Sequence, residues 1–322
     1  MMRRTDAGFT LIELLVSLAI MMIVSATALE GVFRLTRTNQ TVSNRTQMHA
    51  GVRNATELLQ QEVGQAGRVA LPNRVQLAAA LASPGAQTVT LKAVDANGTT
   101  LSTAVATTSM YVGQQLTIDA GANEETVTVT GVNTANSQIS ATFALAHAIN
   151  APVHVYGGLA WGVIPATDSN GAVFANGSTA SVMKMVGDIN SDGNLEYVEY
   201  SCDTTAGNLY RRTMPFDATS KPAIAASMAL LTNIVANPGG TACFTYQEQS
   251  VNNVPYVVDV AITLTVETTD RDPVTGLFQH ETKALLNVSP RNVFNVWQLA
   301  GLGINNRIQP LPASVSTLMA LP

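Results

Sequence analysis

Residues 9–29 form an apolar stretch that contains a single charged side chain, Glu13. At about 20 residues, the stretch is long enough to cross a bilayer as an α-helix. A carboxylate within a bilayer costs on the order of 2.5–3.5 kcal/mol on insertion scales, so an acid in such a segment is first interpreted as functional. The stretch therefore predicts a membrane-spanning helix whose one acid needs a partner.

Two ordinary explanations compete for this stretch. Arg3 and Arg4 precede it, as in a secretory signal, and residues 26–28, Ala-Thr-Ala, would supply a cleavage site that leaves Leu29 first. Glu13 argues against a signal peptide because it would interrupt the apolar core, and the helical pattern also continues past residue 28. An uncleaved membrane anchor is the second ordinary explanation.

Residues 8–13, Gly-Phe-Thr-Leu-Ile-Glu, follow the short basic leader and closely resemble the class III signal of type IV prepilins and type II secretion pseudopilins. The resemblance implies that a membrane prepilin peptidase cuts after Gly8 and that the new first residue, Phe9, is N-methylated. Glycine suits a cleavage site because its backbone adapts readily to an enzyme. Residues 1–8 are then the leader.

The resemblance also implies a role for Glu13 in assembly. When filament subunits stack their apolar helices, the amine of Phe9 and the carboxylate of Glu13 both leave water, and each needs an opposite charge from a neighbouring subunit. The implied partners are other pilins, the prepilin peptidase and an inner-membrane assembly platform. Arg3 and Arg4 favour a cytoplasmic N-terminus, although basic residues at 34 and 37 weaken the asymmetry. The expected location is the inner membrane, with the head outside the cytoplasm, and then the pilus at the cell surface.

The predicted helix extends over residues 9–67, and only its first half is expected to span the membrane. No proline occurs between Phe9 and Pro72, whereas Gly64 and Gly67 favour a stop. Apolar side chains recur every three to four residues beyond the membrane, as in an amphipathic helix; they include Val52, Ala55, Leu59, Val63 and Ala66. Residues 57–67 resemble the end of the long helix in minor pilins of the PilW kind and in J-type pseudopilins.

The rest of the chain is rich in strand patterns, so the predicted fold class is α+β, a long helix packed on an antiparallel sheet. Residues 72–157 are predicted to be an inserted all-β module, with strands at 88–92, 115–119, 126–130, 139–143 and 153–156. Residues 158–300 are predicted to be the pilin head, an antiparallel meander with strands at 181–186, 195–202, 208–212, 242–247, 257–267 and 281–288. Residues 301–322 are expected to be an irregular tail.

Two cysteines, Cys202 and Cys243, lie in the predicted head. An even pair in an extracytoplasmic chain is most simply one disulfide. It would close a loop of roughly 40 residues, worth about 4 kcal/mol in the chain-entropy model. Two buried free thiols are the alternative.

Residues 188–199 match the twelve-residue calcium loop, including Gly193 at its turn. The oxygen-bearing residues are Asp188, Asn190, Asp192, Asn194, Glu196 and Glu199. The flanking residues alternate like strands and not like the helices of an EF-hand. The sequence therefore leaves two interpretations open: a calcium site, or an Asp-Gly hairpin turn with solvated acids. The fold requires no cofactor.

Composition and motifs argue against catalysis and nucleic-acid binding. Only 12% of the 322 residues are charged, 46% are hydrophobic, and the net charge is −5, so no basic field attracts nucleic acid. The four histidines are dispersed, and neither a phosphate-binding glycine loop nor a nucleophile elbow is present. We expect no enzyme activity.

By this resemblance, the sequence predicts a minor pilin that takes part in type IV pilus assembly at or near the tip. The insertion of 80-odd residues supports a minor subunit, since such a head fits poorly into a repeating lattice but is tolerated at an end. A type II secretion pseudopilin is one alternative. A membrane-anchored surface adhesin that uses the β module is the other.

Overall fold

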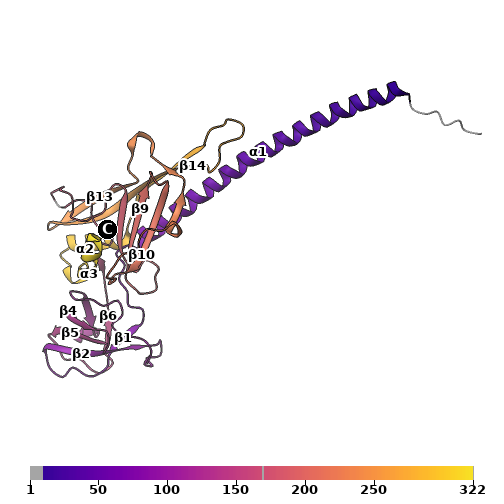
Figure 1. The fold of residues 1–322 in the computed structure, drawn as a ribbon. Helices are drawn as coiled ribbons and strands as arrows, with labels where there is room; N and C mark the ends of the chain where they lie inside the picture. The colour runs from indigo at the N-terminus through magenta and orange to yellow at the C-terminus, as the bar shows by residue number, and fades with distance from the viewer. Residues whose placement is uncertain (1–9, 169, 322) are drawn as a thin grey trace, which may run out of the picture. The chain divides into compact units, whose positions relative to one another are not determined.

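The computed structural model describes residues 10–168 and 170–321. Its first element is the helix α1, Leu11–Gln65, which confirms the long helix predicted over residues 9–67 (Figure 1). The helix ends where Gly67 takes a positive φ of 79° and donates its backbone N–H to the carbonyl of Val186 at 2.8 Å. A Cβ atom at Gly67 would lie 3.1 Å from the carbonyl oxygen of Leu159. Both the positive φ and this close approach of another backbone segment therefore favour glycine at the helix end.

The chain divides into two compact units, and α1 contributes to both. The first unit contains the residues up to Gly51 together with Glu267–Glu281, and the second contains Val52–Val266 together with the residues from Thr282 onward. This division follows packing. The boundaries predicted at 72, 158 and 301 follow changes in composition, and they remain predictions.

In the first unit, a hairpin lies along one face of α1. Thr41 donates to Asp272 at 3.1 Å, Arg45 donates to Gln279, and His49 lies 2.9 Å from Glu281. Helix residues four apart share a face, so the three contacts follow successive turns. The hairpin therefore braces the part of α1 that follows the apolar stretch.

In the second unit, the last turns of α1 bury the stripe that the sequence predicts. The buried positions are Val52, Ala55, Thr56, Leu59, Glu62 and Val63. Glu62 is the one buried acid of the helix, at 6% exposure. It accepts hydrogen bonds from Arg211 at 2.7 Å and from the hydroxyl of Tyr200 at 2.6 Å, so a charge-assisted contact joins the helix to a strand pair.

Residues after the helix form a closed antiparallel barrel, with strands in the order β1-β2-β5-β4-β3-β6. Its strands are β1 Arg74–Leu77, β2 Gly85–Val94, β3 Gln115–Ile118, β4 Glu125–Asn133, β5 Gln138–Phe143 and β6 Pro152–His154 (Figure 1). Alternate side chains such as Leu91, Ile118 and Ile139 fill its interior, which forms a core of its own. Closure removes the exposed strand edges that a small sheet would otherwise have.

The head consists of two sheets, so the prediction of one meander is wrong. The first has the order β11-β10-β9-β8, and in the second β12 and β13 flank β14, which also pairs with β15. The first contains β8 Val182–Gly187, β9 Glu196–Asp203, β10 Asn208–Pro215 and β11 Ala229–Thr232. The second contains β12 Ile234–Val235, β13 Phe244–Val251, β14 Val254–Glu267 and β15 His280–Val288. Asn233, with a φ of 57°, separates β11 from β12 and so marks the break between the sheets.

The helix α2, Arg291–Gly301, ends where the irregular tail was expected to begin. The described residues of that tail are folded, contrary to the prediction: they contain β16 Ile308–Gln309 and α3 Ala313–Ala320, and β16 pairs in parallel with β7, Gly158–Leu159. Gln309 is fully buried, and its amide donates to the carbonyls of Gln115 and Tyr156, each at 2.9 Å. Long-range partners therefore order a segment that lacks a local pattern.

The first head sheet carries a second buried charge cluster, in the cross-strand row of Lys184, Glu199 and Arg212. Glu199 pairs with Arg212 at 3.1 Å and with Lys221 at 3.2 Å. The Lys184 ammonium donates to the carbonyl of Met319 at 3.2 Å, at the end of α3. Cations at the C-terminus of a helix stabilise it, so this cluster holds α3 on the sheet.

Replacing Glu62 with alanine should lower the free energy of unfolding by about 3 kcal/mol, because Arg211 would keep a partly buried charge without its partner. Glu57→Ala is the matched control, since the pair of Glu57 with Arg53 is largely exposed and should contribute less than about 0.5 kcal/mol. Urea denaturation of the detergent-solubilised chain, followed by tryptophan fluorescence, measures both. Equal losses in the two variants would contradict the assignment.

The disulfide between Cys202 and Cys243 links β9 to the residue that precedes β13, across a sequence separation of 41. The double variant Cys202→Ser with Cys243→Ser should lose about 4 kcal/mol of unfolding free energy, because the unfolded chain regains the entropy of that loop. Denaturation with and without dithiothreitol provides the test. Reduction should lower the unfolding free energy of the wild type toward that of the double variant. The unfolding free energy of the variant should not change with dithiothreitol.

Candidate functional site

The predicted cleavage residues, Gly8 and Phe9, lie outside the described residues. The first described residue, Thr10, forms a reciprocal cap with Glu13. The Thr10 backbone N–H and hydroxyl each donate to the Glu13 carboxylate at 3.0 Å, and the Glu13 N–H donates to the Thr10 hydroxyl at 3.3 Å. This is a capping box, which satisfies donors that a helix N-terminus leaves free. Sequence reasoning missed it, although Thr10-Leu-Ile-Glu13 carries its signature.

The capping box gives the acid a partner within its own chain. Charge is still not neutralised there, because a hydroxyl and an amide carry only partial charges. A cation from another molecule can therefore pair with Glu13 once water is removed. The acid lies at the start of the helix, where the dipole also favours a negative charge.

The first half of α1 exposes its apolar side chains. Within α1, an 18-residue window is long and apolar enough to cross a membrane, and none of this window is buried. The exposed side chains run from Leu11, at 78% exposure, through Ile20 and Leu29 to Leu35. An uncovered apolar face of this length needs lipid or other helices around it. The described structure is therefore compatible with membrane anchoring.

The predicted calcium loop is a hairpin turn between β8 and β9. Asp188 is fully buried and accepts a hydrogen bond from the Gly193 N–H at 3.0 Å. Asn190 and Asp192 bond to one another, and Asp192 also accepts from the Asn194 N–H at 2.7 Å. Hydrogen bonds to these amides, of which the Asn194 N–H contributes most, lower the pKa of Asp192. The loop oxygens thus stabilise the turn itself.

One residue of the predicted calcium set is paired with cations in the structure. Glu199, which would provide the last ligand, lies within β9 and pairs with Arg212 and Lys221. Among residues 10–168 and 170–321, no group of three histidine, cysteine or acidic side chains is placed to hold a metal ion. We therefore derive no role for calcium, and calcium binding by Asp188, Asn190, Asp192, Asn194 and Glu196 remains an untested prediction.

The predicted disulfide between Cys202 and Cys243 is present, with Cα atoms 6.5 Å apart. It joins the two sheets of the head, since Cys202 belongs to β9 and Cys243 precedes β13. The alternative of two free thiols is wrong. The bond therefore links the two sheets of the head covalently.

The barrel contains a charged cluster that the sequence did not predict. His147 is 3% exposed, and its ring nitrogens lie 3.3 Å from Asp119 and 2.6 Å from Glu125. Glu125 also accepts the backbone N–H of Ala144 at 2.7 Å. The sequence did not indicate this cluster because Asp119 and Glu125 precede His147 by 28 and 22 positions. Only the folding of the barrel brings the three side chains together. The cluster ties the β5–β6 connection to the barrel wall.

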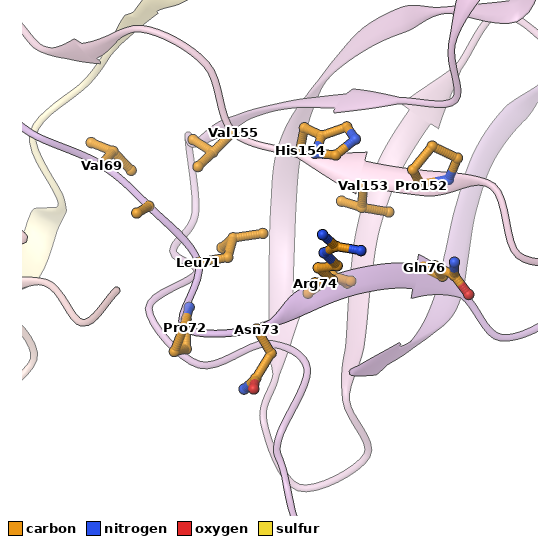
Figure 2. A pocket seen from close by; sticks show the side chains of 12 residues that line it. Val69, Leu71, Pro72, Asn73, Arg74, Gln76, Pro152, Val153, His154 and Val155 are labelled. Atoms are coloured by element: carbon orange, nitrogen blue, oxygen red, sulfur yellow. The ribbon is translucent and has the colours of Figure 1, made fainter. Parts of the chain in front are cut away.

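A pocket of about 700 Å³ opens where the chain enters the barrel (Figure 2). It is lined by residues 69–76 and 152–155. Between these two segments, the strand pairing of β1 with β6 joins Val75 to Val153 and Gln76 to Pro152. Arg74 lies in the wall, and its guanidinium already donates to the carbonyl of Ala96 at 3.0 Å. The pocket contains no acid, and we assign it no chemistry.

Comparison with known proteins gives one match. The model of the prokaryotic N-terminal methylation motif matches residues 3–29. No curated protein and no solved structure matches the chain. The matched residues contain Gly8, Phe9 and Glu13, and they run into the exposed apolar part of α1. The methylation motif and the long apolar helix that follows it make the chain type IV prepilin-like at its N-terminus.

Proposed function

We propose that this protein is a minor pilin. In this proposal, prepilin peptidase cuts between Gly8 and Phe9, and Phe9 is N-methylated. The first half of α1 then holds the protein in the inner membrane, with its head outside the cytoplasm, until it joins a type IV pilus at or near the tip. The observation that carries the proposal is the methylation motif, which continues into the apolar first half of α1, where the window long enough to cross a membrane is not buried.

The barrel supports a minor rather than a major subunit. It lies between the end of α1 and the first head sheet in the chain, and its six strands have their own core. In a helical filament, every internal subunit would need space for this barrel against its neighbours. A subunit at an end has one side without neighbours, so it can carry the extra module.

The motif suggests a structural protein, and the proposal assigns no reaction to the chain. A type II secretion pseudopilin would carry the same processed N-terminus. Deletion separates the two machines: loss of pili supports the minor pilin, whereas loss of protein secretion with normal pili supports the pseudopilin. Normal piliation with lost attachment would instead indicate a surface adhesin.

In cells that contain a prepilin peptidase, we expect a mature chain that begins at methylated Phe9. Intact mass and N-terminal sequencing of the membrane-extracted protein measure this directly. Gly8→Val should block the cut, because a branched side chain restricts the backbone at the site. A first residue of Leu29 would indicate secretory cleavage, and an uncut wild-type chain would indicate a simple anchor; either result overturns the proposal.

Replacing Glu13 with alanine should leave cleavage intact and lower incorporation into pili by at least about tenfold. The physical reason is that the methylated amine of Phe9 in a neighbouring subunit would lose its counter-charge in an apolar surrounding. Quantitative immunoblotting of sheared pili against membranes gives the ratio.

Thr10→Val is the matched control for this experiment, because it removes the hydroxyl of the capping box and keeps the carboxylate. Loss of a cap costs about 1 kcal/mol of helix stability, which the rest of a 55-residue helix absorbs. Thr10→Val should therefore incorporate almost normally. If it fails as badly as Glu13→Ala, then the acid acts through the cap and not through a neighbour.

A further inference from the structure

A second pocket lies between the barrel and the first head sheet, and we call it the seam pocket. Its volume is about 470 Å³. The barrel contributes residues 105 and 107–110, between β2 and β3, and Thr134, between β4 and β5. The head contributes the β8–β9 turn with the start of β9, and the end of β10 with the two residues after it. The lining residues are Val105, Thr107, Thr108, Ser109, Met110, Thr134, Asp192, Asn194, Leu195, Glu196, Pro215, Phe216 and Asp217. The backbone N–H of Leu195 donates to the Ser109 hydroxyl at 3.1 Å, which fixes two of the walls together.

The charged side chains that line the seam pocket are all acidic. The pocket contains three carboxylates, of Asp192, Glu196 and Asp217, and its lining includes no lysine, arginine or histidine. Asp192 and Asp217 are exposed, whereas Glu196 is half-buried. Like charges that face a shared space repel one another, so a cation that enters the space is attracted by all three.

A buried hydroxyl in the same lining lacks a partner. Thr107 has no exposed surface, and its Oγ1 is among the buried polar atoms without a hydrogen bond in the described part of the chain. An unsatisfied buried hydroxyl costs free energy, which a ligand with an N–H group would recover. This observation is independent of the acids.

The remaining wall is apolar, with Met110, Leu195 and Phe216 as buried members. No three acids in the described residues are arranged for a metal ion, so separate positive groups suit the pocket better than one point charge. An alkyl chain can contact the apolar wall while its ammonium groups reach different carboxylates. We propose that the seam pocket binds an aliphatic amine with two or more ammonium groups, supplied as a free polyamine or as lysine side chains of a basic peptide.

Glu196 makes the binding dependent on pH. Burial, followed by the negative charge of Asp192, raises the pKa of the Glu196 carboxyl, although Arg211 opposes the rise and Glu62 adds to it. A bound ammonium group favours the ionised carboxylate. Affinity should therefore be highest above the raised pKa and should fall as the pH drops through it.

The experiment measures binding of spermidine to the detergent-solubilised full chain at low ionic strength, by isothermal titration calorimetry. Saturable binding that added salt weakens is expected, because exposed carboxylates contribute. 1,8-Octanediol, a chain of similar length without charge, should not bind. Penta-lysine forms the second arm: binding of spermidine identifies free amines as sufficient, whereas binding of penta-lysine alone identifies a basic peptide as the source.

Variants locate the binding site. Asp192→Asn with Asp217→Asn should weaken amine binding by at least about fivefold, and asparagine at 192 keeps an acceptor for the turn. Thr107→Val should weaken it by about threefold without loss of stability, because the hydroxyl has no partner in the free protein. Glu196→Gln should remove the dependence on pH that lies above the ordinary range of a carboxyl group, because the carboxyl with the raised pKa is then absent. Glu124→Gln, an exposed acid outside the lining, should change nothing.

Three results would overturn the proposal. They are no binding of either amine, equal binding of octanediol, and amine binding that the seam variants leave unchanged. Calcium chloride serves as a competitor. Calcium binding that spermidine and penta-lysine cannot displace would assign the acids to a metal ion instead. None of these results bears on cleavage after Gly8, so the minor-pilin proposal stands or falls separately.

Discussion

The contact of Glu62 with Arg211 and Tyr200 is the interaction on which the arrangement of the second unit depends. A carboxylate at 6% exposure is tolerated inside a protein only when its oxygens are matched, and here one charged and one neutral donor match them. The bond fixes the rotation of α1 about its axis, and with it the side of the helix that meets β9 and β10. Burial, and after it the negative charge of Glu62, raises the pKa of the Tyr200 hydroxyl above its ordinary value. This hydroxyl therefore keeps the proton that it donates to Glu62.

The opposite face of the same sheet has a second charged anchor. There, Glu199 lies between Arg212 and Lys221, and Lys184 reaches the last turn of α3. Desolvation lowers the pKa of Lys184, and Glu199 opposes this shift. The sheet therefore holds a helix on each face by buried charge, while apolar contacts supply the bulk of the stabilisation. This framework presents the barrel and the β8–β9 turn to one another, and the seam pocket is the space between them.

The N-terminal helix α1 could be predicted closely, because its signals are local. A run without charge or proline indicates a helix, and the apolar stripe from Val52 to Ala66 indicates which side packs. Most strands were also predicted, since alternation of side chains is local too. The division of the head into two sheets was missed because it depends on Asn233 and on pairing between distant strands. The fold of residues 302–321 was missed because Gln309 is ordered by Gln115 and Tyr156, far away in sequence.

The sequence by itself determined the N-terminal methylation motif and the membrane-compatible helix, and it favoured the pairing of the two cysteines, since each follows from a short motif or from composition. It also suggested a calcium loop, which stays a prediction, but tertiary structure decided the place of one expected ligand: β-pairing puts Glu199 between two cations, Arg212 and Lys221. Tertiary structure alone decided that Asp192, Asp217 and Thr107 line one space. Electrostatic interactions and hydrogen bonds act over a few ångströms, so only the folded chain could bring these side chains within reach of one ligand.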